Sequence, residues 1–289
     1  MRAGKSGDEP MRSKEPRLLD PATALARIHE FTVLDVRPGA AFLEGHLDGS
    51  GNIALADFGA RRPELPPRDR PILVVAESGP VAATAARELA ALGFARVSWL
   101  DAPLSSLERG LASRGPAARV SRPAQFLEEV LPLIPRGLAA DLAAGAGREA
   151  VFLAMNGFEV EAWDRDPEAL ARAASLAARH GVAIETVACD LESPAAPLPA
   201  DRYRLVVCFR FLHRPLLPSM VRALAPCGYL VYETYRVGQE RLGRPRRRQF
   251  LLESGELRRA FDELEILRYE EPEPAGGPVT ARLLARRSR

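Results

Sequence analysis

The chain has 289 residues and a mass of 31.5 kDa, about twice the length of a typical domain, so two domains are expected. Its composition, 47% hydrophobic and 27% charged, is typical of globular proteins with buried cores. Forty basic residues against 38 acidic ones leave a net charge of +2, which predicts no general attraction to nucleic acid or membranes. No run of about 18 uncharged apolar residues is present, which excludes a membrane-spanning helix.

The N-terminal residues are charged and lack the apolar stretch of a signal peptide, so we interpret residues 1–16 as a disordered leader. The three cysteines Cys189, Cys208 and Cys227 lie 19 residues apart, far from the CxxC spacing of zinc sites. They are best explained as buried small hydrophobes in a reducing compartment. A cytoplasmic protein without a metal site is therefore predicted.

The first half alternates apolar strand-like runs with helical segments, which is typical of a parallel α/β sheet. In chain order the patterns predict a helix over 21–30, strands over 31–37 and 71–76, a helix over 81–92 and a strand over 97–100. Residues 105–122 are polar, rich in Arg, Ser, Gly and Pro, and without periodicity. They are the predicted linker between a domain over 17–104 and a second domain over 123–289.

The second half continues the same alternation to the end of the chain. Helices are predicted over 124–134, 148–156, 167–180, 216–225 and 253–261. Strands are predicted over 138–143, 159–163, 183–188, 204–209, 229–234, 264–269 and 279–285. The connection between the last two strands is too short for a helical crossover, so this pair is expected to be antiparallel.

Three motifs in the first half carry a family resemblance. They are LDVR (Leu34–Arg37), GHL (Gly45–Leu47) and PILVVAESG (Pro71–Gly79), the last followed by a predicted helix. With these motifs, residues 17–104 resemble a rhodanese-like domain. The resemblance implies that Asp35 and Arg37 hold the fold through buried hydrogen bonds and do not form a catalytic set with His46.

The resemblance also places Ala76 where active rhodaneses carry the cysteine that accepts sulfur as a persulfide. Alanine has no nucleophilic atom. In the same loop Pro80 and Val81 stand where active members usually have polar or basic residues. An inactive domain with a structural or regulatory role is predicted.

A glycine-rich turn follows the first strand of the second domain, in the run Asp141-Leu-Ala-Ala-Gly145-Ala-Gly147. Glycines there let a ligand approach the backbone, and the next helix begins with unpaired N–H donors. Asp164, 17 residues beyond Gly147, ends the next strand, where a carboxylate can accept both hydroxyls of a ribose. NAD and S-adenosylmethionine both satisfy these two features.

Three further features favour S-adenosylmethionine over NAD. Asp141 precedes the glycines, where its carboxylate suits the amino group of a methionine moiety and would repel a pyrophosphate. Asp190 ends the third strand and, with Leu191, suits an adenine amino group. The antiparallel last pair is expected of a seven-stranded methyltransferase sheet and not of a dinucleotide domain.

Residues 124–289 resemble a class I S-adenosylmethionine-dependent methyltransferase. The run DLAAGAGREAVFLAMNGFEVEAWDRDP (Asp141–Pro167) and GELRRAF (Gly255–Phe261) are similar to the TehB-type group of tellurite-resistance proteins. The implied fold is a seven-stranded Rossmann-like sheet with an antiparallel last strand, in addition to the small parallel sheet of the rhodanese-like domain. The usual first motif of this superfamily is DxGxGxG, and here Ala143 replaces its first glycine.

By this resemblance the methionine end of the cofactor meets Asp141, Gly145 and Gly147, the ribose meets Asp164, and the adenine meets Asp190. Arg148 either approaches the carboxylate of the cofactor or is solvated. The full set of predicted cofactor-binding residues is Asp141, Ala143, Gly145, Gly147, Arg148, Asp164, Arg165, Asp190, Leu191 and Phe209.

The methyl acceptor is expected near Cys208–Pro218, which follows the fourth strand. This segment lacks the N/D-PP-Y/F motif of enzymes that methylate amino groups of bases or glutamine. His213 and Arg210 are the predicted catalytic residues, His213 as a base or as an orienting group. Alternatively, His213 caps the following helix.

The loop Arg236–Phe250 has a local excess of five positive charges. It either closes over an anionic acceptor, contacts nucleic acid or is a solvated loop. No interleaved aromatic residues support nucleic acid. The sequence therefore predicts a methyltransferase for a small acceptor that is anionic, a thiol or a chalcogen species. The alternatives are a non-catalytic cofactor-binding or sulfur-sensing regulator and an RNA methyltransferase.

Overall fold

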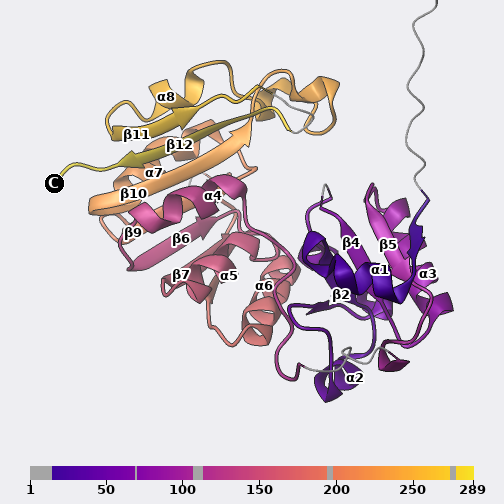
Figure 1. The fold of residues 1–289 in the computed structure, drawn as a ribbon. Helices are drawn as coiled ribbons and strands as arrows, with labels where there is room; N and C mark the ends of the chain where they lie inside the picture. Colours follow the sequence, from indigo (N-terminus) through magenta and orange to yellow (C-terminus); the bar gives the residue numbers. More distant parts are fainter. Residues whose placement is uncertain (1–14, 69, 107–112, 194–197, 274–277) are drawn as a thin grey trace, which may run out of the picture. The chain divides into compact units, whose positions relative to one another are not determined.

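The computed structural model describes residues 15–68, 70–106, 113–193, 198–273 and 278–289. The chain divides into two compact units, Met1–Ser121 and Arg122–Arg289, each with its own sheet and core (Figure 1). The predicted leader lies, up to residue 14, outside the described residues. None of the helices in the described ranges combines the length and apolarity needed to cross a membrane.

The first unit is built on a five-stranded sheet in which all strands are parallel, in the order β1-β5-β4-β2-β3. Its strands are β1 (Arg17–Leu19), β2 (Thr32–Asp35), β3 (Gly51–Asn52), β4 (Ile72–Val75) and β5 (Val97–Leu100). Its helices are α1 (Pro21–Ala26), α2 (Gly39–Glu44) and α3 (Gly79–Ala91). The central strand β4 is apolar throughout and fully buried, because α3 packs on one face of the sheet and α1 on the other.

A buried ion pair holds the loops at the end of β2. The Arg37 guanidinium donates to the Asp35 carboxylate at 2.7 Å and to the carbonyl of Gly45 at 2.7 Å. His46 stacks on Phe42 with ring centroids 3.8 Å apart, and its Nδ1 lies 3.0 Å from the Phe42 carbonyl. Asp35 and Arg37 thus form the buried hydrogen bonds that the rhodanese resemblance implied, and His46 bonds separately to the Phe42 carbonyl.

The second part of the predicted linker belongs to the first unit. The Ala118 amide donates to the Ser50 carbonyl at 2.9 Å. The Val120 side chain packs against the α3-side core and occupies the space next to Gly51, where a Cβ atom would clash with it. The Val120 side chain, backbone hydrogen bonds and the Ser113 hydroxyl, which donates to Asp48, hold residues 113–121 to this unit. A polar and aperiodic sequence does not predict these contacts.

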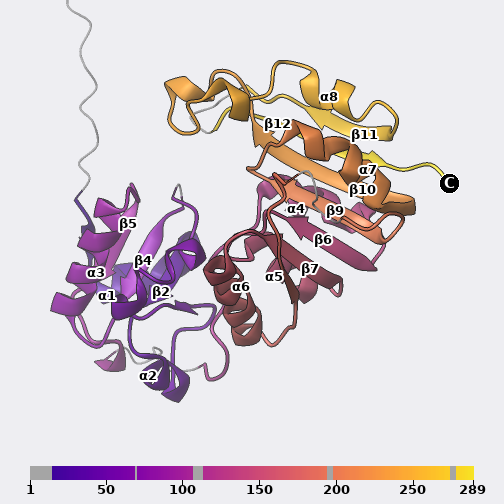
Figure 2. The same ribbon diagram turned by 180° about the vertical axis from the view of Figure 1, so that it is seen from behind.

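The second unit has a seven-stranded sheet in the order β11-β12-β10-β9-β6-β7-β8 (Figure 2). Strand β12 runs antiparallel to both β10 and β11, and the other pairs are parallel, which confirms the predicted antiparallel last pair. The strands are β6 (Leu138–Leu142), β7 (Glu159–Asp164), β8 (Glu185–Ala188), β9 (Tyr203–Phe209), β10 (Leu224–Tyr235), β11 (Glu265–Glu270) and β12 (Thr280–Arg286). The helices are α4 (Gln125–Val130), α5 (Arg148–Met155), α6 (Pro167–Arg179), α7 (Leu217–Ala223) and α8 (Glu256–Ala260).

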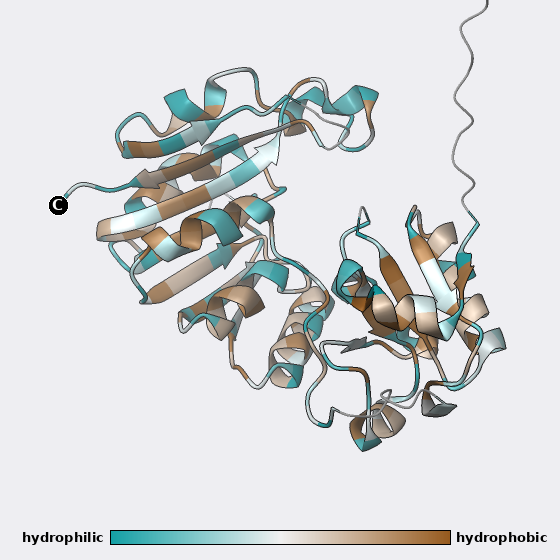
Figure 3. Ribbon diagram, in the orientation of Figure 1, coloured by the Kyte–Doolittle hydropathy of each residue, from teal (hydrophilic) through white to brown (hydrophobic). Residues whose placement is uncertain are grey.

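Apolar side chains cover both faces of this sheet. Helices α4, α5 and α6 contribute to the core on one face, and α7 and α8 to the core on the other. The middle of β12 is strongly hydrophobic, as Figure 3 shows, since this reversed strand is buried between β10 and β11. The predicted fold class is confirmed: one parallel sheet and one larger sheet with a reversed strand.

The predicted helices over 21–30 and 124–134 are α-helical only in their first halves. Each continues as a 3-10 turn, Ile28–Glu30 after α1 and Leu131–Leu133 after α4. The short elements β1, α2 and β3 were not predicted, since two to six residues carry too little periodicity to be seen in the sequence. Of the cysteines, only Cys208 is fully buried, whereas Cys189 and Cys227 are half-buried, and all three are free.

Candidate functional site

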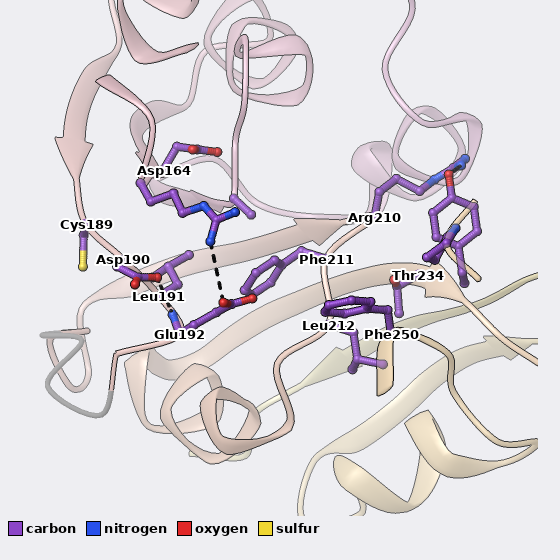
Figure 4. A pocket seen from close by; sticks show the side chains of 14 residues that line it. Asp164, Cys189, Asp190, Leu191, Glu192, Arg210, Phe211, Leu212, Thr234 and Phe250 are labelled. Carbon is purple, nitrogen blue, oxygen red and sulfur yellow. Dashed lines mark hydrogen bonds and ion pairs between the residues drawn. The ribbon is translucent and has the colours of Figure 1, made fainter. Parts of the chain in front are cut away.

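A cavity of about 320 Å³ lies at the carboxyl ends of the parallel strands of the second unit (Figure 4). Its wall takes at least one residue from each of five strand ends: Ala143 after β6, Asp164 ending β7, Cys189 after β8, Arg210 after β9 and Thr234 in β10. Ligands of open parallel sheets bind at this edge, because the loops diverge there and leave a crevice. The other lining residues are Arg165, Asp190, Leu191, Glu192, Phe211, Leu212, Tyr235, Pro245 and Phe250.

The turn from β6 into α5 holds three residues in the left-handed conformation, with φ of +59° at Ala143, +54° at Gly145 and +76° at Gly147. A Cβ atom on Gly147 would lie 2.6 Å from the Cβ of Ala173, so this glycine is needed for α5 to pack on α6. A Cβ atom on Gly145 would meet no described atom within 4 Å. The backbone at Gly145 therefore borders open space that a ligand can approach closely.

Backbone amides of two connections hold the Asp164 side chain in place, one between β6 and α5 and the other between β7 and α6. Its Oδ2 accepts a hydrogen bond from the Gly145 amide at 2.8 Å, and its Oδ1 accepts one from the Asp166 amide at 2.9 Å. A carboxylate offers about four lone-pair positions, so acceptor capacity remains for ligand hydroxyls at the cavity wall. This arrangement is compatible with the predicted ribose contact, which stays a prediction.

The end of the cavity near β8 carries acidic groups. Asp190 follows the strand, and its Oδ1 accepts a hydrogen bond from the Glu192 amide at 3.0 Å. Arg165 and Glu192 form an ion pair of 3.7 Å across this end, visible in Figure 4. Both side chains are largely exposed, so the pair contributes little to stability and is free to rearrange around a ligand.

Asp141 lies beneath the glycine turn and is 2% exposed. It accepts a hydrogen bond from the Ala150 amide, whereas its Oδ2 is buried and has no partner among the described residues. Burial raises the pKa of Asp141 well above its usual value, and the neighbouring carboxylates of Glu149 and Asp164 raise it further. A buried carboxylate oxygen without a donor is costly, and a ligand ammonium group would satisfy it.

At the opposite end of the cavity, Arg210 adopts a left-handed backbone with φ of +61°. Its Nη1 donates to the Tyr235 hydroxyl at 2.8 Å and its Nη2 to Glu233 at 3.3 Å. The guanidinium also lies over the Tyr235 ring, 4.9 Å from the centroid. Burial raises the pKa of Glu233, and the charge of Arg210 opposes that rise.

The predicted site residues fall into three groups. Those that line the cavity are Ala143, Asp164, Arg165, Asp190, Leu191 and Arg210. Gly145 and Gly147 belong to the turn behind the wall, and Asp141 lies beneath that turn, in β6. The remaining three lie elsewhere: Arg148 is exposed, Phe209 is 8% exposed within the α4–α6 core, and His213 is half-buried.

His213 begins the short 3-10 helix Arg214–Leu216, and its side chain makes no capping hydrogen bond. His213 thus occupies the N-cap position that the alternative prediction gave it, but without a hydrogen bond from the side chain. His213 is not among the residues that line the cavity. Its role as a base or orienting group stays a prediction without support from the position of the side chain.

The sequence did not single out several residues of the wall. Thr234 and Tyr235 end β10 and could have been found by the rule that the carboxyl ends of parallel strands face the ligand. Phe211 and Leu212 follow Arg210 in the segment assigned to the acceptor. Pro245 and Phe250 come from the arginine-rich loop and had no signal of their own.

The arginine-rich loop thus forms part of the cavity wall through two apolar residues. Arg248 pairs with Glu253 at 2.7 Å, away from the lining residues. Arg246 and Arg247 are exposed and form no ion pair with any residue of the described ranges. Closure of the arginines over an anion stays a prediction.

The glycine turn, the strand order and the position of the cavity agree with a family match. Residues 124–275, more than half of the chain, match the model of the family described as tellurite resistance protein TehB. The chain belongs to the TehB family. This match agrees with the predicted methyltransferase class of the second unit and with S-adenosylmethionine as its cofactor. Residues 20–106 match the rhodanese-like domain, which confirms that resemblance as well.

A curated relative, hemagglutinin 1 of Eikenella corrodens, is 29% identical over 136 residues, which cover 45% of this chain and 45% of the relative. This chain therefore spans less than half the length of that relative. Among solved structures, TehB of Haemophilus influenzae is 20% identical, with a TM-score of 0.48 over 56% of this chain and 61% of that one. The N-methyltransferase NodS of Bradyrhizobium japonicum WM9 is 20% identical, with a TM-score of 0.47 over 57% and 93% of the two chains.

Because Ala143 has a left-handed backbone, Ala143→Gly should stabilise the protein by about 1 kcal/mol. Ala174→Gly is the matched control, since Ala174 is exposed in the interior of α6 and the same change there should destabilise by about 1 kcal/mol. Urea unfolding of the two variants measures both effects. A destabilising Ala143→Gly would contradict the left-handed assignment.

The raised pKa of Asp141 makes stability depend on pH with a definite sign. The folded protein binds the proton of Asp141 more tightly than the unfolded chain does. This proton therefore adds its full contribution to the free energy of unfolding below the pKa of the unfolded chain, about 4, and the contribution is lost as the pH rises towards the pKa of the folded protein. Within that window Asp141→Asn should gain up to about 1.4 kcal/mol of unfolding free energy per pH unit relative to the natural protein. Urea unfolding of cofactor-free protein at a series of pH values measures this gain.

Asp262→Asn, at an exposed carboxylate, controls for the substitution itself. A difference between Asp141→Asn and the natural protein that is constant across pH would show that Asp141 holds no perturbed proton.

Proposed function

We propose that the chain transfers the methyl group of S-adenosylmethionine to a small acceptor that is anionic, a thiol or a chalcogen species, and that its rhodanese-like domain is non-catalytic. The family match supplies the enzyme class. The observation that carries the proposal is the cavity at the strand ends, with carboxylates at one end and Arg210 at the other.

The residues around the turn fit the cofactor. Gly145 borders open space, and the buried Oδ2 of Asp141 lacks a donor that the ammonium group of the methionine moiety would supply. Asp164 and Asp190 keep acceptor capacity at the wall for hydroxyl and amino groups. These four residues would hold the methionine, ribose and adenine parts, in the order that the sequence predicted.

S-adenosylmethionine supplies, when bound, a methyl group activated by the sulfonium charge, and the electron pair of the broken C–S bond stays on the cofactor sulfur. The contribution of the protein is then to orient the acceptor and to exclude water. An anionic acceptor brings its own electron pair and needs no strong base. This is in keeping with the described cavity wall, which contains no histidine.

The first unit keeps the rhodanese-like fold without the reactive atom. Ala76 follows β4 and is 1% exposed, and its carbonyl accepts a hydrogen bond from the Leu104 amide at 3.0 Å. The following loop carries Glu77, whose charge opposes a thiolate or an anionic sulfur donor. These features support a structural or regulatory role for the domain.

The function is tested by cofactor binding and by turnover of methyl-labelled cofactor on a panel of thiols and chalcogen oxyanions. Asp164→Ala should weaken binding of S-adenosylmethionine by about 1.5–3 kcal/mol, because a charged hydrogen-bond acceptor is lost. Asp166→Ala is the matched control. It removes the side chain that caps α6, which costs about 1 kcal/mol of stability but should leave cofactor affinity unchanged.

Calorimetry measures both affinities. Equal affinity of natural protein and folded Asp164→Ala would overturn the ribose assignment. Tight cofactor binding without transfer to any acceptor would favour the regulator over the enzyme.

The natural protein should produce no thiocyanate from thiosulfate and cyanide, because Ala76 offers no thiolate. Ala76→Cys should restore little activity, since Pro80 and Val81 also differ from an active loop. Titration of the new thiol establishes that it is present and reduced. Robust sulfur transfer by the natural protein would refute the non-catalytic role.

A further inference from the structure

The Arg210 end of the cavity holds polar groups whose hydrogen-bonding capacity the described residues do not use up. Thr234 is 1% exposed and lines the cavity, yet its hydroxyl forms no hydrogen bond with any residue in the described part of the chain. The hydroxyl is not one of the sealed polar atoms without a partner, so it is accessible from the cavity and available to a ligand that supplies a hydrogen bond. Figure 4 shows Thr234 between Arg210 and Phe250, so its hydroxyl belongs to the acceptor end.

The Tyr235 hydroxyl is also poised to donate into this end. It accepts a hydrogen bond from Arg210 at 2.8 Å. A phenol has a single proton, and that proton is given to no described residue. Since Tyr235 lines the cavity, its hydroxyl can donate to a ligand oxygen while Arg210 holds the ring in place.

Arg210 itself keeps donors for a ligand. A guanidinium has five N–H groups, and the contacts to Tyr235 and Glu233 use two of them. Together Arg210, Tyr235 and Thr234 present a cation and two hydroxyls on neighbouring strand ends. A planar, two-oxygen anion such as a carboxylate suits this set, because guanidinium binds carboxylates through paired N–H donors.

The walls around these groups are apolar. Phe211, Leu212, Pro245 and Phe250 border the same end, and in Figure 4 Phe211 lies between this end and the Asp190 end. A small inorganic oxyanion would leave these side chains in contact with water, whereas an organic acid with an apolar body would cover them. The whole cavity, about 320 Å³, is near the lower limit of roughly 300–1,000 Å³ for ligand pockets, so the acceptor is small.

We infer that this end, which we call the carboxylate subsite (Arg210, Thr234 and Tyr235), binds the carboxylate of a small organic thiol acid and leaves its sulfur free for methylation. The inference rests on the proposed function and names its substrate class. The acceptor thiolate forms the new S–CH₃ bond after its proton has gone to solvent. The carboxylate oxygens, held by Arg210, act as the anchor and are not methylated.

The test compares matched thiols that differ only by the carboxylate: 3-sulfanylpropanoate with propane-1-thiol, and 2-sulfanylbenzoate with benzenethiol. For each pair we measure kcat/KM of the natural protein, of Arg210→Gln and of the control Arg222→Gln, which removes an exposed guanidinium on α7 that is remote from the lining residues. Cofactor affinity is measured by calorimetry for every variant.

The natural protein should prefer the carboxylated thiol of each pair. Arg210→Gln should reduce that preference about 10- to 100-fold, through a raised KM for the carboxylated thiol, with cofactor affinity retained. Arg222→Gln should keep the preference. Thr234→Val should reduce it about 3- to 10-fold and Thr234→Ser should not, since serine keeps the hydroxyl.

A natural protein that methylates both thiols of a pair equally well, or whose preference survives Arg210→Gln, overturns the carboxylate subsite while the methyltransferase function stands. Methylation of an inorganic chalcogen oxyanion but of neither carboxylated thiol overturns it as well. Absence of both cofactor binding and transfer to every acceptor refutes instead the proposed function on which the inference rests.

Discussion

The sharp turn that leaves β6 is the constraint on which the second unit depends. The chain must reverse from a buried strand into α5 within a few residues, and it does so by placing Ala143, Gly145 and Gly147 in left-handed conformations. Gly147 lets α5 pack on α6, and the Gly145 amide is tied to Asp164 at the end of β7. The hydrogen bond from Gly145 to Asp164 and the contact of Gly147 with Ala173 thereby bring the ends of β6 and β7 and the start of α5 to the same cavity.

The cavity has two ends of opposite charge because the strands that build it end in different residues. Asp164 ends β7, and Asp190 and Glu192 follow β8. Arg210 follows β9 and is held by Glu233 and Tyr235 from β10. The carboxylates at the β7 and β8 end can accept hydrogen bonds from the hydroxyl and amino groups of a nucleoside. The Arg210 end carries the opposite charge, so the two halves of the sheet offer chemically different surfaces to a ligand.

The first unit has the rhodanese-like fold but carries Ala76 at the position of the reactive cysteine. The buried Asp35–Arg37 pair and the Ala-rich face of α3 maintain the sheet, and both are independent of the residue that follows β4. At that position Ala76 packs in the apolar core. Packing tolerates this residue because alanine is small and apolar, whereas sulfur transfer needs a thiolate. Stability and activity therefore depend on different atoms of the same loop.

The sequence by itself determined the alternation of strands and helices, the glycine turn, the acidic residues at the ends of β7 and β8, and the reversal of β12. Each of these follows from local information: apolar periodicity, glycine spacing and a connection too short for a crossover. Ala76 and Ala143 could be identified in the same way, because each departs from a contiguous motif.

Only the tertiary structure decided which side chains share the cavity. Phe250 and Arg210 are 40 residues apart in the sequence and meet at one end of the cavity, because β9 and β10 are neighbours and the loop after β10 folds back along the strand ends. His213 is three residues from Arg210 and yet does not line the cavity, since the chain has already turned into a 3-10 helix. The partner of a side chain depends on strand order and loop path, which are set by long-range packing and leave no pattern in the local sequence.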